Sequence, residues 1–352
     1  MELIELSKLD IQEEDFKEGL NYWNDQRDRV ELLENHFKKE FNAEYAISTT
    51  NGTSAIHLAL CALELRRGDK IICSVNSHPN IPEMIRHFDA EPIFVDIEED
   101  TFNIDMDVCE RVLQSKNTKK LRGMILTHIA GQPCNLEKAY ELKNKYDLLL
   151  LVDVRNSYGG HYKGKLLGSA YSDIAIFSMF PEKENISANG GMMITNNGDV
   201  ADRASLLRFH AITKNGYSQL DYIYDVVDLG YRYDISQIDA GFYLSTLKRK
   251  NANIARHKEI AQMYNKALAN TPHIKIPQNN GDHNYSLYII KVDKNRDGFA
   301  KDLLEKHIQT GLHYIPLHLL NYYKTKYSLR VNSFPNALRC YQQILSLPYY
   351  NK

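Results

Sequence analysis

The feature that most limits the possible folds of this chain is the run Leu148-Leu149-Leu150-Leu151-Val152, which ends in Asp153. Five consecutive apolar residues are typical of a strand that is buried on both faces, as in a parallel sheet covered by helices. A second apolar run, Ile174–Phe177, is followed by Ser178 and then by Lys183. In open α/β sheets, ligands bind outside the carboxyl ends of the strands. The two runs therefore predict that Asp153 and Lys183 reach the same edge of a sheet.

Strand-like and helix-like segments alternate along much of the chain. This alternation favours a mostly parallel sheet whose strands are joined by right-handed crossovers through helices. We expect further strands at residues 45–48, 70–74, 91–96, 123–127 and 192–195, and helices at residues 81–88, 107–113, 136–146 and 200–209.

Small and hydroxyl-bearing residues stand at one of the expected strand-to-helix turns. Gly52, Thr53 and Ser54 follow a short strand and precede an apolar helix. Backbone N–H groups and hydroxyls at such a turn can approach an anion at the helix N-terminus. The same residue types are also common where a helix is only capped. From the residues alone, both a phosphate site and a simple cap stay open.

The last third of the chain has a different pattern. Apolar residues spaced to bury one side predict a long helix over residues 236–269, followed by a smaller α+β region with strands at 274–276 and 287–290 and a helix at 298–307. We therefore expect a large domain over residues 1–235, which includes an N-terminal helical segment, and a small C-terminal domain over residues 236–352.

Charge and cysteine content exclude several classes of function. A formal net charge of −2 gives no electrostatic reason to expect nucleic acid or an anionic membrane as a partner. The five cysteines form no close pair, so neither a disulfide framework nor a metal site is predicted. No stretch approaches the length of a membrane span, and the expected location is the cytoplasm.

The order and spacing of these motifs resemble those of the DegT/DnrJ/EryC1/StrS family of sugar aminotransferases, which belong to the fold-type I pyridoxal phosphate enzymes. The matching residues are Asp153 with Asn156 three residues later, the Phe177-Ser178 segment with Lys183, and the Gly190-Gly191 pair. The resemblance implies a large domain with a mixed, mostly parallel seven-stranded sheet between helices, a small C-terminal α+β domain, and pyridoxal 5'-phosphate as cofactor.

The resemblance also implies roles for individual residues. Lys183 would be the Schiff-base lysine, and Asp153 would face the ring nitrogen and keep it protonated. The cofactor phosphate would be bound by Gly52, Thr53, Ser54 and Ser178.

Three more positions correspond to cofactor-binding positions of the family but carry altered or variable residues. His78 falls where most members have an aromatic side chain that stacks on the pyridine ring, and a loop histidine without that role is the alternative. Asn156 would serve the ring oxygen in place of the usual Gln or His. Arg232 matches a residue that reaches the partner subunit's cofactor phosphate, which implies a homodimer.

The activity implied by the resemblance is transfer of an amino group, from L-glutamate, to a keto-sugar nucleotide in amino-sugar biosynthesis for a surface polysaccharide or glycan. A sister branch of the family dehydrates the sugar and has His in place of the lysine, so Lys183 favours transamination. Two further alternatives are a non-catalytic, regulatory relative of the same fold and an α/β enzyme without pyridoxal phosphate. No G-x-G-x-x-G follows the first strand, which counts against a dinucleotide-binding version.

Overall fold

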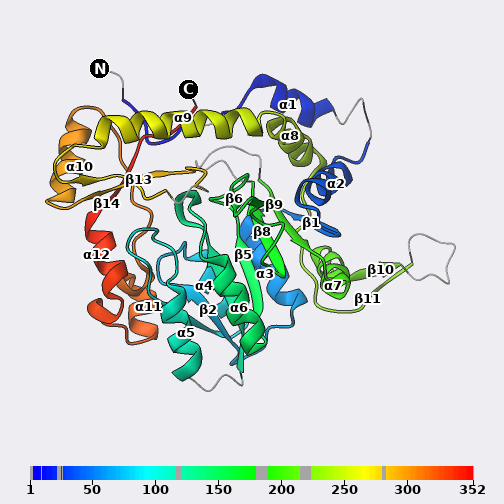
Figure 1. Cartoon of the computed structure of the whole chain (residues 1–352). Coiled ribbons are helices and arrows are strands. Elements are labelled where there is room, and N and C mark those ends of the chain that lie inside the picture. The colour runs from blue at the N-terminus through cyan, green and yellow to red at the C-terminus, as the bar shows by residue number, and fades with distance from the viewer. Residues whose placement is uncertain are drawn as a thin grey trace.

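The computed structural model describes residues 3–8, 10–21, 25, 27–115, 120–179, 189–214, 223–279 and 283–351. Lys183 lies outside these ranges, so the structure places the residues on either side of the lysine but not the lysine itself. A sheet flanked by helices forms the centre of the molecule, and the long helix α9 (Lys250–Leu268) lies across one end of it (Figure 1).

The central sheet has the strand order β1-β9-β8-β5-β4-β2-β3. Neighbouring strands are parallel except at β9, which is antiparallel to both β1 and β8. The expected mixed, mostly parallel seven-stranded sheet is therefore confirmed. Its strands are β1 (Tyr45–Thr49), β2 (Lys70–Ser74), β3 (Glu91–Val95), β4 (Leu121–Thr127), β5 (Leu149–Asp153), β8 (Ile174–Ser178) and β9 (Gly191–Thr195).

Strand β5 is buried on both faces, as its run of leucines predicted. Leu150 and Val152 pack into the hydrophobic core on one face of the sheet, and Leu151 packs into the core on the other. Each of the three is at most 1% exposed. Because side chains alternate along a strand, a continuous apolar run is needed to fill two cores at once.

The helices between the strands lie within a few residues of the expected ranges. They are α3 (Gly52–Ala62), α4 (Asn80–Arg86), α5 (Met106–Ser115), α6 (Leu136–Tyr146) and α7 (Gly198–Arg208). None of the helices in the described part of the chain is both long and apolar enough to cross a membrane.

The single helix expected over residues 236–269 is wrong in one respect, because the structure has two helices there, α8 (Gln237–Leu247) and α9. No glycine or proline marks the break. At the break, the Arg249 guanidinium instead donates hydrogen bonds to both carboxylate oxygens of Asp15, at 2.8 and 2.6 Å. A contact between residues 234 positions apart thus lies where the helix is interrupted.

The N-terminal helical segment also consists of two helices, α1 (Glu13–Leu20) and α2 (Arg29–Phe41). Asp28 caps α2 by accepting hydrogen bonds from the backbone N–H groups of Val30 and Glu31, both at 3.0 Å. Such a cap satisfies N–H groups that have no partner within the helix, so Asp28 gives α2 a defined start.

The C-terminal region is built on a three-stranded antiparallel sheet of β12 (Ile274–Lys275), β13 (Tyr288–Val292) and β14 (Ile344–Leu347). The first residues of the chain join this region, because Ile4 pairs with Ile308 and the Tyr349 N–H donates to the Leu6 carbonyl at 3.0 Å. The division into domains at residues 235 and 236 stays a prediction. The remaining helices are α10 (Arg296–Glu305), α11 (Asn321–Lys326) and α12 (Pro335–Gln343).

Two small hairpins were not expected from the sequence. One pairs β6 (His161–Tyr162) with β7 (Lys165–Leu166). The other pairs β10 (Ile212–Lys214) with β11 (Tyr224–Val226), and this second pair of strands projects from the body of the molecule (Figure 1). Strands of two or three residues are too short to show an alternating pattern.

Candidate active site

Asp153 is the last residue of β5 and is only 1% exposed, at the carboxyl end of the parallel strands. Its Oδ1 accepts the backbone N–H of Arg155 at 3.1 Å. Its Oδ2 accepts two hydrogen bonds from the Arg155 guanidinium, from Nε at 2.8 Å and from Nη2 at 2.6 Å. The buried carboxylate at the edge of the sheet is therefore already paired with a cation.

The N-terminus of α3 lies beside the end of β8. Gly52 packs so closely on Ser178 that a Cβ at position 52 would stand 2.7 Å from the Ser178 Cβ. Asn51 caps the helix, because its Oδ1 accepts the Ser54 N–H at 2.8 Å. The fold thus brings the four residues expected to bind phosphate to one helix N-terminus, where the helix dipole favours an anion. These residues are Gly52, Thr53, Ser54 and Ser178.

Asn80 connects this helix end to Asp153, and sequence reasoning missed it. Its Nδ2 donates to the Thr53 Oγ1 at 3.3 Å, and its Oδ1 accepts from the Arg155 Nη2 at 3.0 Å. Asn80 is 3% exposed. The only sequence signal was its position two residues after His78 in a loop at the carboxyl end of β2.

His78 belongs to the same network. The Asn80 backbone N–H donates to its Nδ1 at 3.2 Å, and the centre of its ring lies 6.2 Å from that of Tyr314, roughly edge to face. Burial lowers the pKa of His78, and the positive charge of Arg155 lowers it further. An uncharged imidazole is suited to lie against a flat ring, but its stacking role stays a prediction.

Asn156 follows Arg155 and is 3% exposed. Its Nδ2 donates to the Tyr314 hydroxyl at 3.4 Å, which links the end of β5 to the C-terminal region. No pattern in the sequence indicated that the Tyr314 hydroxyl would meet Asn156. The role of Asn156 towards a ring oxygen stays a prediction.

Arg232 lies apart from the network of hydrogen bonds around Asp153. Its side chain is 65% exposed, its Nε lies 2.6 Å from the Asp234 Oδ1, and its guanidinium lies over the Phe209 ring at 4.9 Å. Its two chain neighbours, Tyr231 and Tyr233, line a cavity of about 600 Å³ together with Thr53 and Ser54 among others. Within one chain, Arg232 thus stands near the edge of the predicted phosphate site without entering the network.

The segment that carries Lys183 starts and ends beside this network. Its two described ends are joined by a hydrogen bond of 2.9 Å from the Met179 N–H to the Gly190 carbonyl. A Cβ at Gly191 would stand 2.3 Å from the Asn51 carbonyl oxygen, so only glycine fits there. Both ends of the segment are therefore held next to the N-terminus of α3.

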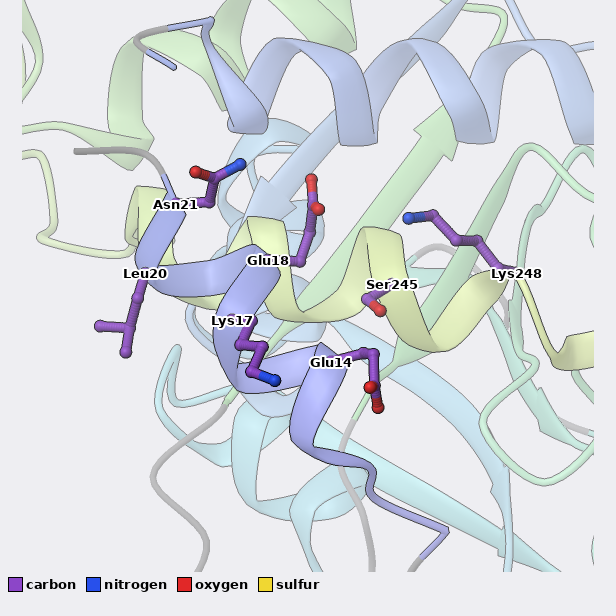
Figure 2. A pocket seen from close by; sticks show the side chains of 7 residues that line it. All are labelled: Glu14, Lys17, Glu18, Leu20, Asn21, Ser245 and Lys248. Atoms are coloured by element: carbon purple, nitrogen blue, oxygen red, sulfur yellow. The ribbon is translucent and has the colours of Figure 1, made fainter. Parts of the chain in front are cut away.

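Two other cavities help to delimit the site. One, of about 290 Å³, adjoins the network and is lined in part by Arg155, Ser178, Asn284 and Ser286. The other, of about 510 Å³, lies between α1 and α8 and contains none of the predicted site residues (Figure 2); it is lined by Glu14, Lys17, Glu18, Leu20, Asn21, Ser245 and Lys248. Within the described ranges, no group of three or more His, Cys, Asp or Glu side chains could hold a metal ion.

The residues at the edge of the sheet fit pyridoxal 5'-phosphate. A buried carboxylate is available for the ring nitrogen, and a tight turn of small residues at the start of α3 is available for the phosphate. Arg155 is an additional cation in this setting, and nothing in the sequence pattern suggested its contact with Asp153.

Comparison with known proteins agrees with this fit. Residues 11–352 match the DegT/DnrJ/EryC1/StrS aminotransferase family. The chain is 31% identical over 332 residues to the uncharacterized protein MJ1066 of Methanocaldococcus jannaschii, covering 91% of this chain and 84% of that protein. It is 29% identical over 340 residues to the spore coat polysaccharide biosynthesis protein SpsC of Bacillus subtilis, covering 93% and 86%.

Solved structures show the same fold. PseC of Helicobacter pylori, an aminotransferase involved in the biosynthesis of pseudoaminic acid, matches with a TM-score of 0.88 and 22% identity, covering 99% of this chain and 94% of that one. The putative sugar aminotransferase Spr1654 of Streptococcus pneumoniae, in its PMP-form, matches with a TM-score of 0.90 and 24% identity, covering 98% and 94%.

Proposed function

The chain belongs to the DegT/DnrJ/EryC1/StrS aminotransferase family of pyridoxal phosphate-dependent sugar aminotransferases, and from this premise we propose that it aminates a keto-sugar nucleotide with L-glutamate as donor. The product would be an amino sugar for a surface polysaccharide or glycan. The observation that carries the proposal is a buried carboxylate, Asp153, beside the N-terminus of α3 in a chain that matches the family over residues 11–352. The names of SpsC and PseC, which concern polysaccharide and pseudoaminic acid biosynthesis, support the substrate class.

When bound, pyridoxal 5'-phosphate supplies an electron sink and carries the amino group between donor and acceptor. In the proposed site, Asp153 would hold the ring nitrogen and His78 would pack against the ring. Thr53 and Ser54 at the N-terminus of α3 would hold the phosphate, because backbone N–H groups and hydroxyls can donate to it there. Lys183 would hold the cofactor, and as a general base it would take a proton from the Cα of the donor.

The assignment of Lys183 is tested by covalent labelling. Borohydride reduction of the protein with bound cofactor, followed by peptide mass mapping, should place the pyridoxyl group on Lys183. A label on another lysine would overturn the role of this residue, and no label at all would overturn the cofactor proposal.

The reaction is tested with a panel of substrates. Protein supplied with pyridoxal 5'-phosphate, glutamate and a set of 4-keto and 3-keto sugar nucleotides should form 2-oxoglutarate and an amino sugar, which mass spectrometry detects. Loss of water from the sugar without amino transfer would instead support the dehydratase alternative. Bound cofactor without any turnover would support a regulatory role.

We further propose a homodimer in which Arg232 completes the phosphate site of the partner subunit. Its exposure supports this role, and so do the exposed apolar residues just before it in the chain, Val226, Val227 and Leu229, which are 56%, 53% and 79% exposed. Exposed apolar patches of this kind are typical of interfaces.

Subunit mixing tests the dimer. A hybrid of a Lys183→Ala subunit and an Arg232→Ala subunit would contain one intact site, so mixing the two inactive proteins should restore part of the activity. Failure to recover activity after proven subunit exchange would contradict the shared site.

A further inference from the structure

The guanidinium of Arg155 stands among the residues expected to contact the cofactor. Through Nε and Nη2 it holds the Oδ2 of Asp153, at 2.8 and 2.6 Å. Through Nη2 it also reaches Asn80, which in turn contacts Thr53 and His78. The proposed ring-nitrogen partner, ring-stacking residue and phosphate-site residue are thus all joined through one arginine and one asparagine.

A carboxylate that faces a protonated ring nitrogen acts through its negative charge and through a free acceptor position. The Oδ1 of Asp153 is engaged by a backbone N–H, and its Oδ2 is engaged twice by Arg155. The Asp153 side chain is 1% exposed and the Arg155 side chain is 18% exposed, so little water screens the two charges. A ring nitrogen that approaches Asp153 therefore meets an oxygen whose charge is already balanced by Arg155.

We propose that Arg155 competes with the ring nitrogen of pyridoxal 5'-phosphate for the carboxylate of Asp153 and thereby sets the affinity for the cofactor. The proposal rests on the proposed role of Asp153. In this proposal the guanidinium releases Oδ2 when the cofactor binds, and the free energy of this ion pair is subtracted from the free energy of cofactor binding.

The structure provides an adjoining space for the released guanidinium. Arg155 already lines the adjoining cavity of about 290 Å³, and Asn284 and Ser286 line it as well. The Asn284 Oδ1 and the Ser286 Oγ are buried and have no hydrogen-bond partner among the described residues. Arg155 therefore has an adjoining space into which it can move, and two residues that line this space carry oxygens without a donor.

Arg155→Leu and Arg155→Lys separate this role from a purely structural one. Leucine removes the competing charge, so cofactor binding should tighten about tenfold to a hundredfold, as expected for the loss of a charge-assisted pair. Lysine keeps the charge but not the two guanidinium hydrogen bonds to Oδ2, so the dissociation constant of the lysine variant should fall between those of the wild type and the leucine variant. Equilibrium dialysis of pyridoxal 5'-phosphate against the full chain measures these constants without reference to turnover.

A second readout uses thermal unfolding. Without cofactor, Arg155→Leu should melt at a lower temperature than the wild type, since Asp153 is left buried without its cation. Added cofactor should then raise the melting temperature by more in the variant than in the wild type, because binding to the folded state is tighter.

Arg86→Leu is the matched control. Arg86 is 15% exposed and pairs with Glu91 at the opposite edge of the sheet, so this variant should lose stability without any change in cofactor affinity.

The outcomes distinguish this proposal from the proposed function. Equal or weaker cofactor binding by Arg155→Leu, with normal binding by the wild type, would overturn the competition and leave the aminotransferase proposal standing. In an Asp153→Asn background, Arg155→Leu should no longer tighten binding; if it still does, Asp153 is not the shared partner and the competition is wrong. If neither the wild type nor Arg155→Leu binds pyridoxal 5'-phosphate, both proposals fail.

Discussion

Within the described ranges, two buried aspartates are each paired with an arginine guanidinium through two hydrogen bonds. They are Asp15 in α1 and Asp153 at the end of β5. The hydrogen-bond lengths are the same in both pairs, 2.8 and 2.6 Å. The pairs differ in sequence separation, because Asp15 is 234 residues from Arg249 whereas Asp153 is two residues from Arg155. A long-range pair ties distant elements together, and a pair between near neighbours in the chain adds little restraint to the fold.

The two pairs also differ in their distance from the predicted site. Arg249 holds α1 against the junction of α8 and α9, next to the surface cavity of Figure 2, which contains no predicted site residue. Arg155 lies at the carboxyl edge of the parallel strands, where α/β proteins bind their ligands. We infer that the first pair serves stability and the second serves the site, and the following predictions test this difference.

The largest effect is expected on turnover, for Asp153→Asn. The variant should keep bound cofactor but lose turnover by about a hundredfold or more, as when one electrostatic partner of a transition state is removed. Its stability should also fall, since Arg155 keeps its contact with Asn80 but loses the carboxylate that balances its charge. Steady-state kinetics and urea unfolding of the same samples measure both quantities. Turnover near that of the wild type would show that the end of β5 has been misinterpreted.

The matching substitution in the other pair is Asp15→Asn. Removing one partner of a buried pair destabilises by about 3 kcal/mol or more, because the remaining charge stays buried without compensation. We expect the lower end of that range, since Arg249 is 20% exposed and also contacts the Asp10 carbonyl. The turnover per folded molecule should stay near that of the wild type. A large loss of turnover with unchanged stability would reverse the assignment of the two pairs.

Much of the sheet could be predicted from the sequence, and so could the position of the site. Each central strand is a short apolar run, and parallel strands bring the residues that follow them to one edge. Asp153, Ser178 and the Gly52 turn therefore had to lie near one another once the order of the strands followed the expected fold.

The contacts that connect these residues could not be predicted. The direction of the Arg155 side chain depends on packing around the end of β5, and the sequence alone does not distinguish an arginine pointing to solvent from one turned back onto Asp153. The interruption between α8 and α9 was missed for a similar reason, because Arg249 lies at that point without any glycine or proline. Long-range and side-chain contacts overrode local propensity at both places.

A smaller effect is expected from pH, through buried histidines. Burial lowers the pKa of His128 from its ordinary 6.5 to about 4, and the pKa of His283 to about 3. Between these values and 6.5, the unfolded chain binds protons that the folded chain does not, so stability is complete above about pH 6.5 and decreases as the pH falls towards 4. Each such histidine contributes up to about 1.4 kcal/mol per pH unit within its window.

His283→Asn tests this effect, since an asparagine oxygen can still accept the Tyr285 N–H that now donates to His283. The variant should show a shallower loss of stability between pH 6.5 and 4 in urea unfolding, whereas replacing the exposed His161 by Asn should leave the slope unchanged.

The Asp15 pair is expected to respond in a separate pH window. Burial raises the pKa of that carboxyl, but the hydrogen bonds and charge of Arg249, together with hydrogen bonds from the Gln12 backbone and Ser245, outweigh burial and hold the pKa below the ordinary 3.8. Its contribution is therefore lost only at more acid pH. For the histidine test, a slope of stability against pH that is unchanged in His283→Asn would show that His283 does not contribute to the pH dependence.

The smallest effect is expected for an exposed pair on α9, which calibrates the comparison. Arg256 and Glu259 lie 3.0 Å apart, close to the distances of the two buried pairs, but their side chains are 50% and 63% exposed. Water and salt screen such charges, so Glu259→Gln should change the free energy of unfolding by about 0.5 kcal/mol or less. The difference should vanish in high salt, while the loss in Asp15→Asn persists, because Asp15 is fully buried. Suppose instead that Glu259→Gln destabilised the protein as much as Asp15→Asn. Hydrogen-bond distance, rather than burial and sequence separation, would then govern how much these pairs contribute to the free energy of unfolding, and the contrast between Asp15 and Asp153 would lose its basis.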